Sequence, residues 1–191
     1  MILFHYPDTV KESFQRRYAK ITWPERPDRL AAWCRGQTGY PIVDAAMRCL
    51  TQTGWMHNRL RMITAMFLVK DLDAHWRLGE AFFRQWLIDY DQASNVGGWQ
   101  WSAGTGTDAA PYFRVMNPVL QGRRFDPQGA FVRRWLPELQ GAATKNIHQP
   151  WLMSPELQKQ ARCVIPGNYP APLVDHGKAR LAAIARLQDR Q

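Results

Sequence analysis

The sequence predicts an all-α fold. Apolar residues recur every three to four positions over several segments, which is the spacing of one face of a helix. No segment alternates apolar and polar residues as a half-buried β-strand does, and the sequence contains neither repeats nor low-complexity stretches. A length of 191 residues is enough to bury a substantial core, in one large domain or two small ones.

The first forty residues carry the weakest helical pattern. Met1–Pro7 is typical of the end of a helix, because its apolar run has no capping residue before it. The segment 8–40 is polar and is interrupted by prolines and glycines, which favours loops with short helical turns. A clear helix is predicted from Pro41, at the favoured first helical position, to Gly54.

Longer helices are predicted over Met56–Asp71 and about Leu72–Ile88. Beyond Asp89, small polar residues predict another helix start at which the backbone packs closely against a neighbour. Helical patterns return at Gln128–Leu136 and Leu173–Asp189. The residues expected in the buried stripes of the two longer helices are Leu60, Ile63, Phe67 and Leu68 for the first, and Trp76, Phe82, Phe83, Trp86 and Leu87 for the second.

Composition narrows the class of protein. Hydrophobic residues make up 46% of the chain and charged residues 21%, so a soluble globular protein is expected. The longest apolar runs, such as Met66–Val69, are far too short to cross a bilayer, and no secretory signal opens the chain. Three cysteines without a CxxC pair favour the cytoplasm and argue against a disulfide framework or a zinc site.

Two quantities point toward function. The formal net charge of +9 is common among proteins that bind nucleic acid, although simple solubility explains it equally well. Nine tryptophans are an unusually high number for this length. Tryptophan often fills cores, but it also forms stacking platforms and electron relays, so the positions of these residues decide between the roles.

A polar arc is predicted on the helix that contains residues 54–62. At about 100° per residue, Asn58, Arg59 and Met62 fall within one narrow arc. An amide, a guanidinium and a thioether on one face could contact a base edge, a phosphate and a stacked ring. An ordinary amphipathic helix with a solvated arginine is the competing interpretation.

Asp89 and Asp91 form a pair of carboxylates at a predicted helix start. They could cap the helix, ligate a metal with Asn95 as a further oxygen ligand, or pair with an arginine beside a polar ring. Arg61 is the candidate partner, and a pair shielded from water would need such compensation. Capping is the simplest of the three interpretations.

Two glycines precede a tryptophan in residues 95–101, which allows close approach of the backbone to a flat ligand. Trp99 and Trp101 point about 200° apart on a helix, so they cannot serve the same surface. One of them can face inward while the other faces a cleft.

Taken in order, these segments resemble consecutive blocks of the photolyase/cryptochrome family. The resemblance runs almost without gaps from about Trp23 to Leu139, and loosely to the C-terminus. Asn58 after His57 resembles the class I cyclobutane pyrimidine dimer photolyases, whereas (6-4) photolyases and animal cryptochromes have a second His there. Trp101 separates the chain from single-strand-preferring cryptochromes, which usually have Tyr. The blocks are TGYPIVDAAMRCL, GWMHNRLRMITAMFLVKDL, DYDQASNVGGWQW and GTDAAPYFRVMNPVLQG.

The resemblance implies an FAD cofactor and assigns roles to named residues. The flavin contacts it implies are Trp55, Arg61 (paired with Asp89), Asp89, Tyr90, Asp91 and Asn95, the last facing flavin N5. The implied electron relay consists of Trp99, Trp76 and Trp23. The residues implied to line a cavity for a flipped-out pyrimidine dimer are Asn58, Arg59, Met62, Trp101 and Gln121. Flipping normally costs a few kcal/mol, and less for a damaged base.

The implied activity is that of a deoxyribodipyrimidine photo-lyase, in which light-excited reduced FAD lends one electron to the dimer. The expected partner is DNA containing pyrimidine dimers, with no membrane and with a monomeric protein. The chain is expected to be the C-terminal part of the helical FAD-binding domain, incomplete at its N-terminus. The α/β antenna domain is then missing, so no antenna folate or deazaflavin is expected. A cryptochrome-like photoreceptor and a truncated DNA-binding remnant remain open as alternatives.

Overall fold

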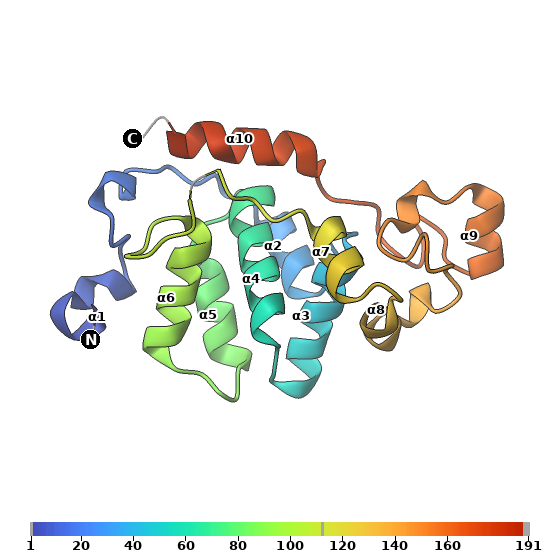
Figure 1. Cartoon of the computed structure of the whole chain (residues 1–191), viewed down its shortest axis with the longest axis horizontal. Coiled ribbons are helices and arrows are strands. Elements are labelled where there is room, and N and C mark those ends of the chain that lie inside the picture. Colours follow the sequence, from blue (N-terminus) through green and yellow to red (C-terminus); the bar gives the residue numbers. More distant parts are fainter. Residues whose placement is uncertain (1, 112, 189–191) are drawn as a thin grey trace.

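The computed structural model describes residues 2–111 and 113–188, and this part of the chain is helical without a β-strand (Figure 1). The predicted all-α class is confirmed. Met1 and Asp189, the outer residues of the first and last predicted helical segments, lie outside the described residues. The α-helices are α1 Ile2–His5, α2 Pro27–Cys34, α3 Pro41–Thr53, α4 Asn58–Met66, α5 Trp76–Trp86, α6 Gln92–Ala103, α7 Pro118–Phe125, α8 Ala130–Trp135, α9 Pro155–Ala161 and α10 His176–Gln188.

The core lies between α3, α4, α5 and α6, which pack side by side (Figure 1). Helix α3 is the most buried, because apolar side chains occupy nearly every position from Pro41 to Leu50. Pro41 takes its first turn as predicted, and Gly54 ends it in the left-handed region at φ 70°. That conformation favours glycine, so the sequence itself sets both ends of this helix.

The first of the two longer helices ends at Asp71 as predicted but starts later, and the second is shorter than predicted at both ends. Helix α4 starts at Asn58, where the side chain of His57 accepts a hydrogen bond from the Arg59 N–H, and a π-helical turn, η3 Phe67–Asp71, continues it. The chain then breaks at Asp73, which has φ 59°, and α5 begins only at Trp76. The predicted ranges were wrong at these ends because histidine is not an expected cap and because apolar periodicity continues through the break.

The predicted burial of Trp86 was wrong. Trp86 is 36% exposed, whereas Trp76 and Phe83 are almost fully buried. Phe83 lies seven residues after Trp76 and returns to the same side of α5, but Trp86 is rotated about 80° from that side. Trp86 instead lies at the helix end with its ring 6.0 Å from that of Phe82. Phe82 and Leu60 are only partly buried.

Three helices lie in segments where no distinct helix was predicted. They are α2, α7 and α9, and each begins with a proline at the first helical position. Their eight or fewer residues give too few repeats for a clear hydrophobic period. Helix α2 nevertheless supplies Trp33, which is fully buried in the core.

Helix α10 crosses one edge of the bundle and packs against η3 (Figure 1). Near its start, His176 Nδ1 lies 2.5 Å from the Asp71 carboxylate. Near its end, Arg186 pairs with Asp73. The predicted helix from Leu173 therefore begins three residues later, at the residue that makes the first of these contacts.

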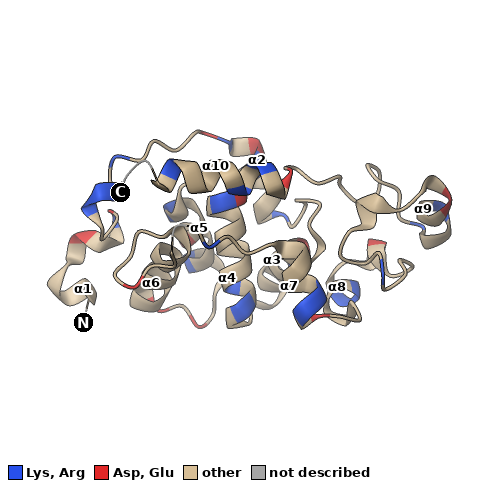
Figure 2. Cartoon of the chain, turned by 45° about the horizontal axis from the view of Figure 1, so that its top comes forward, with Lys and Arg blue, Asp and Glu red and all other residues tan. Residues whose placement is uncertain are grey.

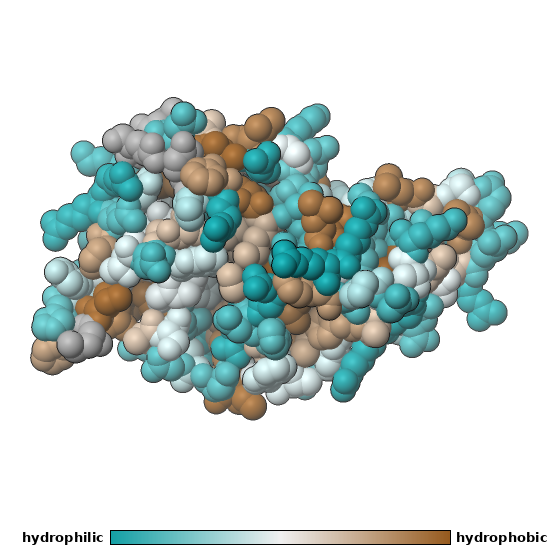
Figure 3. Space-filling view, viewed as in Figure 1, coloured by the Kyte–Doolittle hydropathy of each residue, from teal (hydrophilic) through white to brown (hydrophobic). Residues whose placement is uncertain are grey.

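Hydrophilic side chains cover much of the surface (Figure 3), as expected of a protein that folds in water. In Figure 3, teal hydrophilic side chains separate the brown apolar patches on the face that is shown. Phe4 and Ile88 are the most exposed large apolar residues that the structure describes, at 84% and 79%. Among residues 2–111 and 113–188, no helix is long and apolar enough to cross a membrane.

Candidate functional site

A cavity of about 140 Å³ opens between α4, the start of α6 and the loop between α5 and α6. Its wall combines an arginine, carboxylates and amides with apolar and aromatic side chains. The lining residues are Asn58, Arg61, Met62, Ala65, Phe83, Leu87, Asp89, Tyr90, Asp91, Ser94, Asn95, Gly98, Trp99 and Ser102. Apolar walls with a few convergent polar groups are typical of a cofactor site.

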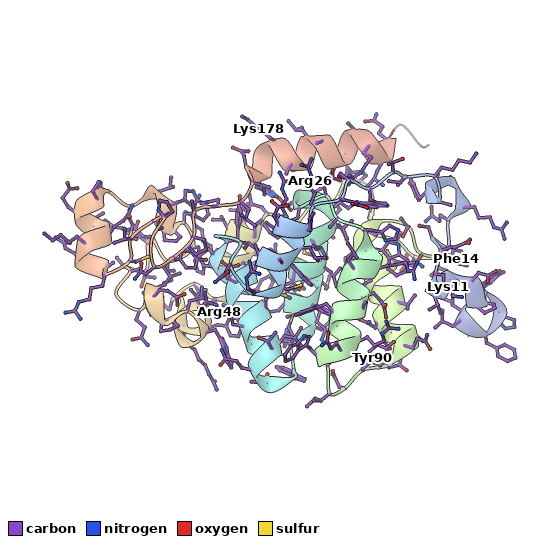
Figure 4. All side chains as sticks on the ribbon, turned by 180° about the vertical axis from the view of Figure 1, so that it is seen from behind. Lys11, Phe14, Arg26, Arg48, Tyr90 and Lys178 are labelled. Atoms are coloured by element: carbon purple, nitrogen blue, oxygen red, sulfur yellow. The ribbon has the colours of Figure 1, made fainter. Side chains whose placement is uncertain are left out.

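The loop before α6 brings the two predicted carboxylates to the cavity. Asp91 caps α6 by accepting a hydrogen bond from the Ser94 N–H at 2.8 Å, and this bond lowers the pKa of Asp91. The capping interpretation is therefore confirmed for Asp91. Tyr90 lies beside it, at the end of the bundle where α5 and α6 are joined (Figure 4).

Arg61 and Asp89 form the predicted ion pair. Arg61 Nη2 lies 2.9 and 2.8 Å from the two carboxylate oxygens, and Arg61 Nε donates to the Met56 carbonyl at 2.7 Å. The side chains are 26% and 47% exposed, so the pair is not shielded from water. An exposed pair of this kind stabilises a fold by about 0–1 kcal/mol. Its contacts fix the position of the guanidinium at the cavity wall.

Asn95 is oriented by a buried glutamate. Its Nδ2 donates to the main-chain oxygen and to the carboxylate of Glu80, both at 3.1 Å. Both amide protons are thereby used, so the carbonyl Oδ1 of Asn95 is the atom left for a ligand. Glu80 was not among the residues predicted for the site; it lies two turns before the loop and is only 6% exposed.

Trp99 forms the inner wall of the cavity. It is 2% exposed, and its ring centroid lies 5.0 Å from that of Phe83. The indole rests directly on Gly79, where an added Cβ would overlap it. Within the described structure, the indole nitrogens of Trp99 and Trp76 are buried without a hydrogen-bond partner. A ligand in the cavity would therefore lie against an indole that is held by packing alone.

The other two tryptophans of the predicted relay extend away from the cavity. Trp76 lies on α5 one turn before Gly79, and is almost fully buried. His75 lies between Trp76 and Trp23, with ring centroids 5.7 and 5.5 Å from theirs. Trp23 is only half-buried, so the series runs from the cavity to the surface. Trp33, which the sequence analysis did not single out, has its ring centroid 6.0 Å from that of Trp99.

Four of the predicted ligand contacts do not line this cavity, and Trp55 and Trp101 are two of them. Trp55 is 48% exposed, its ring centroid lies 6.3 Å from that of His57, and it is not among the residues that line the cavity. Trp101 lines a second hollow of about 460 Å³ with Phe14 and Gln100. Trp99 and Trp101 therefore face different surfaces, as their spacing on the helix predicted.

The polar arc of α4 extends from the cavity mouth to the end of α7. Asn58 and Met62 lie together at the cavity mouth, with Nδ2 3.9 Å from Sδ. The Arg59 guanidinium stacks 4.8 Å from the ring centre of Phe125 at the end of α7. Gln121, one turn before Phe125, has a buried Oε1 without a hydrogen-bond partner in the described structure. Figure 2 shows further basic residues on α7 and α8, and these include Arg124, Arg133 and Arg134.

The cavity wall suits a flat ring, such as the flavin ring of FAD, better than a metal ion. The described residues contain no group of three or more His, Cys, Asp or Glu side chains that could hold a metal ion. Gly98 lines the cavity, and a Cβ added there would meet no atom within 4 Å, so the backbone is open to a flat ring. The free Oδ1 of Asn95 and the Arg61 guanidinium offer an acceptor and a donor to such a ring.

Comparisons with known proteins agree with this geometry. The family model described as the FAD binding domain of DNA photolyase matches residues 1–189. Deoxyribodipyrimidine photo-lyases of Alkalihalophilus pseudofirmus and Escherichia coli are 51% and 55% identical over 97% and 87% of this chain. The chain spans only 39% and 34% of the length of those two proteins.

Solved structures give the same result. A class III photolyase from Agrobacterium tumefaciens superposes with a TM-score of 0.95 at 47% identity, over 99% of this chain and 39% of that one. A cryptochrome from Synechocystis superposes with a TM-score of 0.90 at 41% identity, over 95% of this chain and 38% of that one.

Proposed function

The chain belongs to the family of the FAD-binding domain of DNA photolyase, and we propose that it acts in the light-dependent repair of cyclobutane pyrimidine dimers in DNA. FAD is the cofactor of this family. The cavity with Asp89, Asn95 and Trp99 on its wall is the observation that carries the proposal, because it offers polar contacts and an indole to one flat ring. The reaction class is that of a carbon–carbon lyase.

When bound, reduced FAD supplies one electron to the dimer under light and recovers it after the ring opens. The chain's own residues bind and orient. Asn95 presents its carbonyl oxygen as an acceptor for a ring N–H, held there by Glu80. Arg61 places a positive charge at the wall and is fixed by Asp89 and the Met56 carbonyl. Tyr90 and Asp91 lie at the same wall.

Trp99, Trp76 and Trp23 serve as the electron relay that reduces an oxidised cofactor. Their placement supports this role, since Trp99 lines the cavity, Trp76 is buried one turn before the Gly79 on which Trp99 rests, and Trp23 is half-buried. Indole is readily oxidised to a radical, which a phenylalanine ring is not. The apolar surroundings of Trp99 and Trp76 hold the rings in fixed positions.

The residues that we assign to DNA contact are Asn58, Arg59, Met62 and Gln121 on α4 and α7, and Trp101 in the second hollow. Asn58 and Met62 border the cavity mouth, and Arg59 extends from the same helix toward the basic helices α7 and α8. A flipped dimer would therefore enter beside the cofactor while the arginines contact phosphates. Trp55 was predicted to line the cavity. Because it is exposed next to His57, we assign it to the outer surface instead.

A flavin photoreceptor is the second candidate function, and the cryptochrome among the similar structures favours it. Asn58 and Met62 at the cavity mouth favour repair. We further propose that the protein is a class I photolyase and a monomer. We also propose a cytoplasmic location, which the free cysteines Cys34, Cys49 and Cys163 support.

The test uses the purified chain reconstituted with FAD. We expect a flavin absorption band near-stoichiometric with protein, and loss of thymine dimers from irradiated DNA under blue light after chemical reduction. A flavin band without repair would favour the photoreceptor. DNA binding without a flavin band would favour a DNA-binding remnant.

A further inference from the structure

Trp23, the outer residue of the proposed relay, has a histidine and an arginine beside its ring. The ring centroid of His75 lies 5.5 Å from that of Trp23, and the Arg186 guanidinium lies 4.4 Å from the centre of the Trp23 ring. Arg186 reaches it from α10, which is 163 positions later in the sequence. In Figure 4, α10, marked by Lys178, lies along the edge of the bundle beside Arg26 at the start of α2.

The charge at Arg186 is permanent at neutral pH. Burial lowers the pKa of Arg186, but only to about 10. Its partner is Asp73, whose left-handed backbone directs the carboxylate toward α10. His75 adds no charge, because burial and then the nearby Arg77 lower its pKa, and its Nδ1 accepts a hydrogen bond from the Arg77 N–H. Arg186 is thus the cation that lies over the Trp23 ring.

A hollow of about 210 Å³ borders Trp23. Its wall contains His75, Tyr18 and two exposed charged residues, Lys11 and Glu12. Water in this hollow, or the Glu12 carboxylate, can accept a proton that leaves Trp23. The titratable groups that face Trp23 are therefore His75, Arg186 with Asp73, Lys11, Glu12 and Tyr18.

We infer that Arg186 is a positioning residue of the relay, which drives the proton off oxidised Trp23 and so traps the separated charge. The inference rests on the relay role in the proposed function. The electron lost from Trp99 to the light-excited flavin is replaced from Trp76 and then from Trp23. Trp23 becomes a radical cation, its indole N–H bond releases the proton to the hollow, and a neutral radical remains.

The physical reason is repulsion between two positive charges. A guanidinium that stabilises a neutral indole by stacking is repelled by an oxidised one. Loss of the proton removes that repulsion, so Arg186 lowers the pKa of the radical cation. The neutral radical is a poor electron acceptor without a proton, and return of the electron is slowed.

The experiment is transient absorption on the FAD-loaded chain, which distinguishes the tryptophan radical cation from the neutral radical. Arg186→Gln should lengthen the radical-cation lifetime about tenfold, the effect of one pKa unit. Arg186→Lys should retain most of the parent rate because the charge remains. Asp73→Asn, which keeps a residue that tolerates positive φ, should shorten the lifetime by leaving Arg186 uncompensated.

Arg180→Gln, at an exposed position of the same helix, removes the same charge and should leave the lifetime unchanged. Thermal unfolding of each variant shows whether α10 still docks. An Arg186→Gln lifetime equal to that of the folded parent would overturn the inference alone. A parent chain that binds FAD but forms no tryptophan radical would overturn the relay, and this inference with it.

Discussion

The amide nitrogen of Asn95 on α6 lies 3.1 Å from both the main-chain oxygen and the carboxylate of Glu80 on α5. A buried carboxylate thus determines which end of a cavity amide faces the ligand. Glu80→Ala should leave FAD bound but speed the air oxidation of the reduced flavin several-fold, because Asn95 is free to rotate. Recovery of the flavin band in the dark measures this rate. Glu80→Gln retains an acceptor and is the control, and equal rates in all three proteins would contradict the prediction.

Asp89→Asn should reduce FAD retention while changing the free energy of unfolding by no more than about 1 kcal/mol, because the pair with Arg61 is partly exposed. Gel filtration followed by absorption measures retention, and denaturant titration measures stability. Arg61→Lys keeps the charge but loses the guanidinium, whose Nη2 contacts both carboxylate oxygens while its Nε donates to the Met56 carbonyl. Its FAD retention should fall between that of the parent and that of Asp89→Asn. Undiminished flavin content in Asp89→Asn would show that the carboxylate has no role in binding.

Gly79→Ala should destabilise the protein by about 1–3 kcal/mol, because the new methyl group overlaps the Trp99 indole. Gly97→Ala on α6 is the matched control. A Cβ at Gly97 meets nothing within 4 Å, so this change should stabilise the helix by about 0.5–1 kcal/mol. Thermal unfolding of the two variants should shift in opposite directions, and shifts of the same sign would refute the assigned contact.

Trp99→Phe should fold and bind FAD yet fail to photoreduce it. The packing cost is about 1–3 kcal/mol, whereas the phenyl ring is far harder to oxidise. Trp76→Phe should behave similarly, and Trp23→Phe should permit a charge separation that recombines rapidly. Flavin bleaching under blue light with an external reductant measures the effect.

Repair by chemically reduced flavin is the control for the tryptophan series, since transfer to the dimer does not use the relay. It should survive all three changes. Photoreduction at the parent rate in Trp99→Phe would mean that the three residues serve packing only.

Arg59→Gln should weaken binding to irradiated and intact DNA alike and reduce the dependence of log affinity on log salt by about one unit. The Arg59 guanidinium lies over Phe125 toward the basic helices, so it is placed for a phosphate contact. Asn58→Ala should instead reduce only the preference for dimers. Titration at several salt concentrations tests both, and an unchanged salt slope in Arg59→Gln would exclude the phosphate contact.

The sequence was informative wherever a role depends on neighbours along one helix. The cap at Asp91, the opposite directions of Trp99 and Trp101, and the start of α3 at Pro41 all follow from local spacing. The helical segment that starts with α4 ends at Asp71 as predicted, but its π-helical turn at Phe67–Asp71 was missed because the apolar pattern continues through it. Side-chain caps from His57 and His75 were missed because histidine is an uncommon cap.

Contacts between distant segments could not be predicted from one sequence. Glu80 looks like a solvated residue of α5 until Asn95 and Tyr90 are packed against it. Arg186 looks like one of many basic surface residues until α10 docks over Trp23. Trp55 was assigned to the cavity by resemblance, but its position after Gly54 turns it outward.

Every residue that lines the cavity lies between Asn58 and Ser102, whereas the outer end of the tryptophan series joins Trp23 to Arg186. The residues of the cavity are therefore separated by a few tens of positions in the sequence. The contact between Trp23 and Arg186 joins residues that are separated by most of the chain. Contacts of short sequence separation form early in folding. The binding site for the flavin ring can thus form when α4, α5 and α6 pack together. The outer end of the tryptophan series is completed only when α10 docks on the bundle.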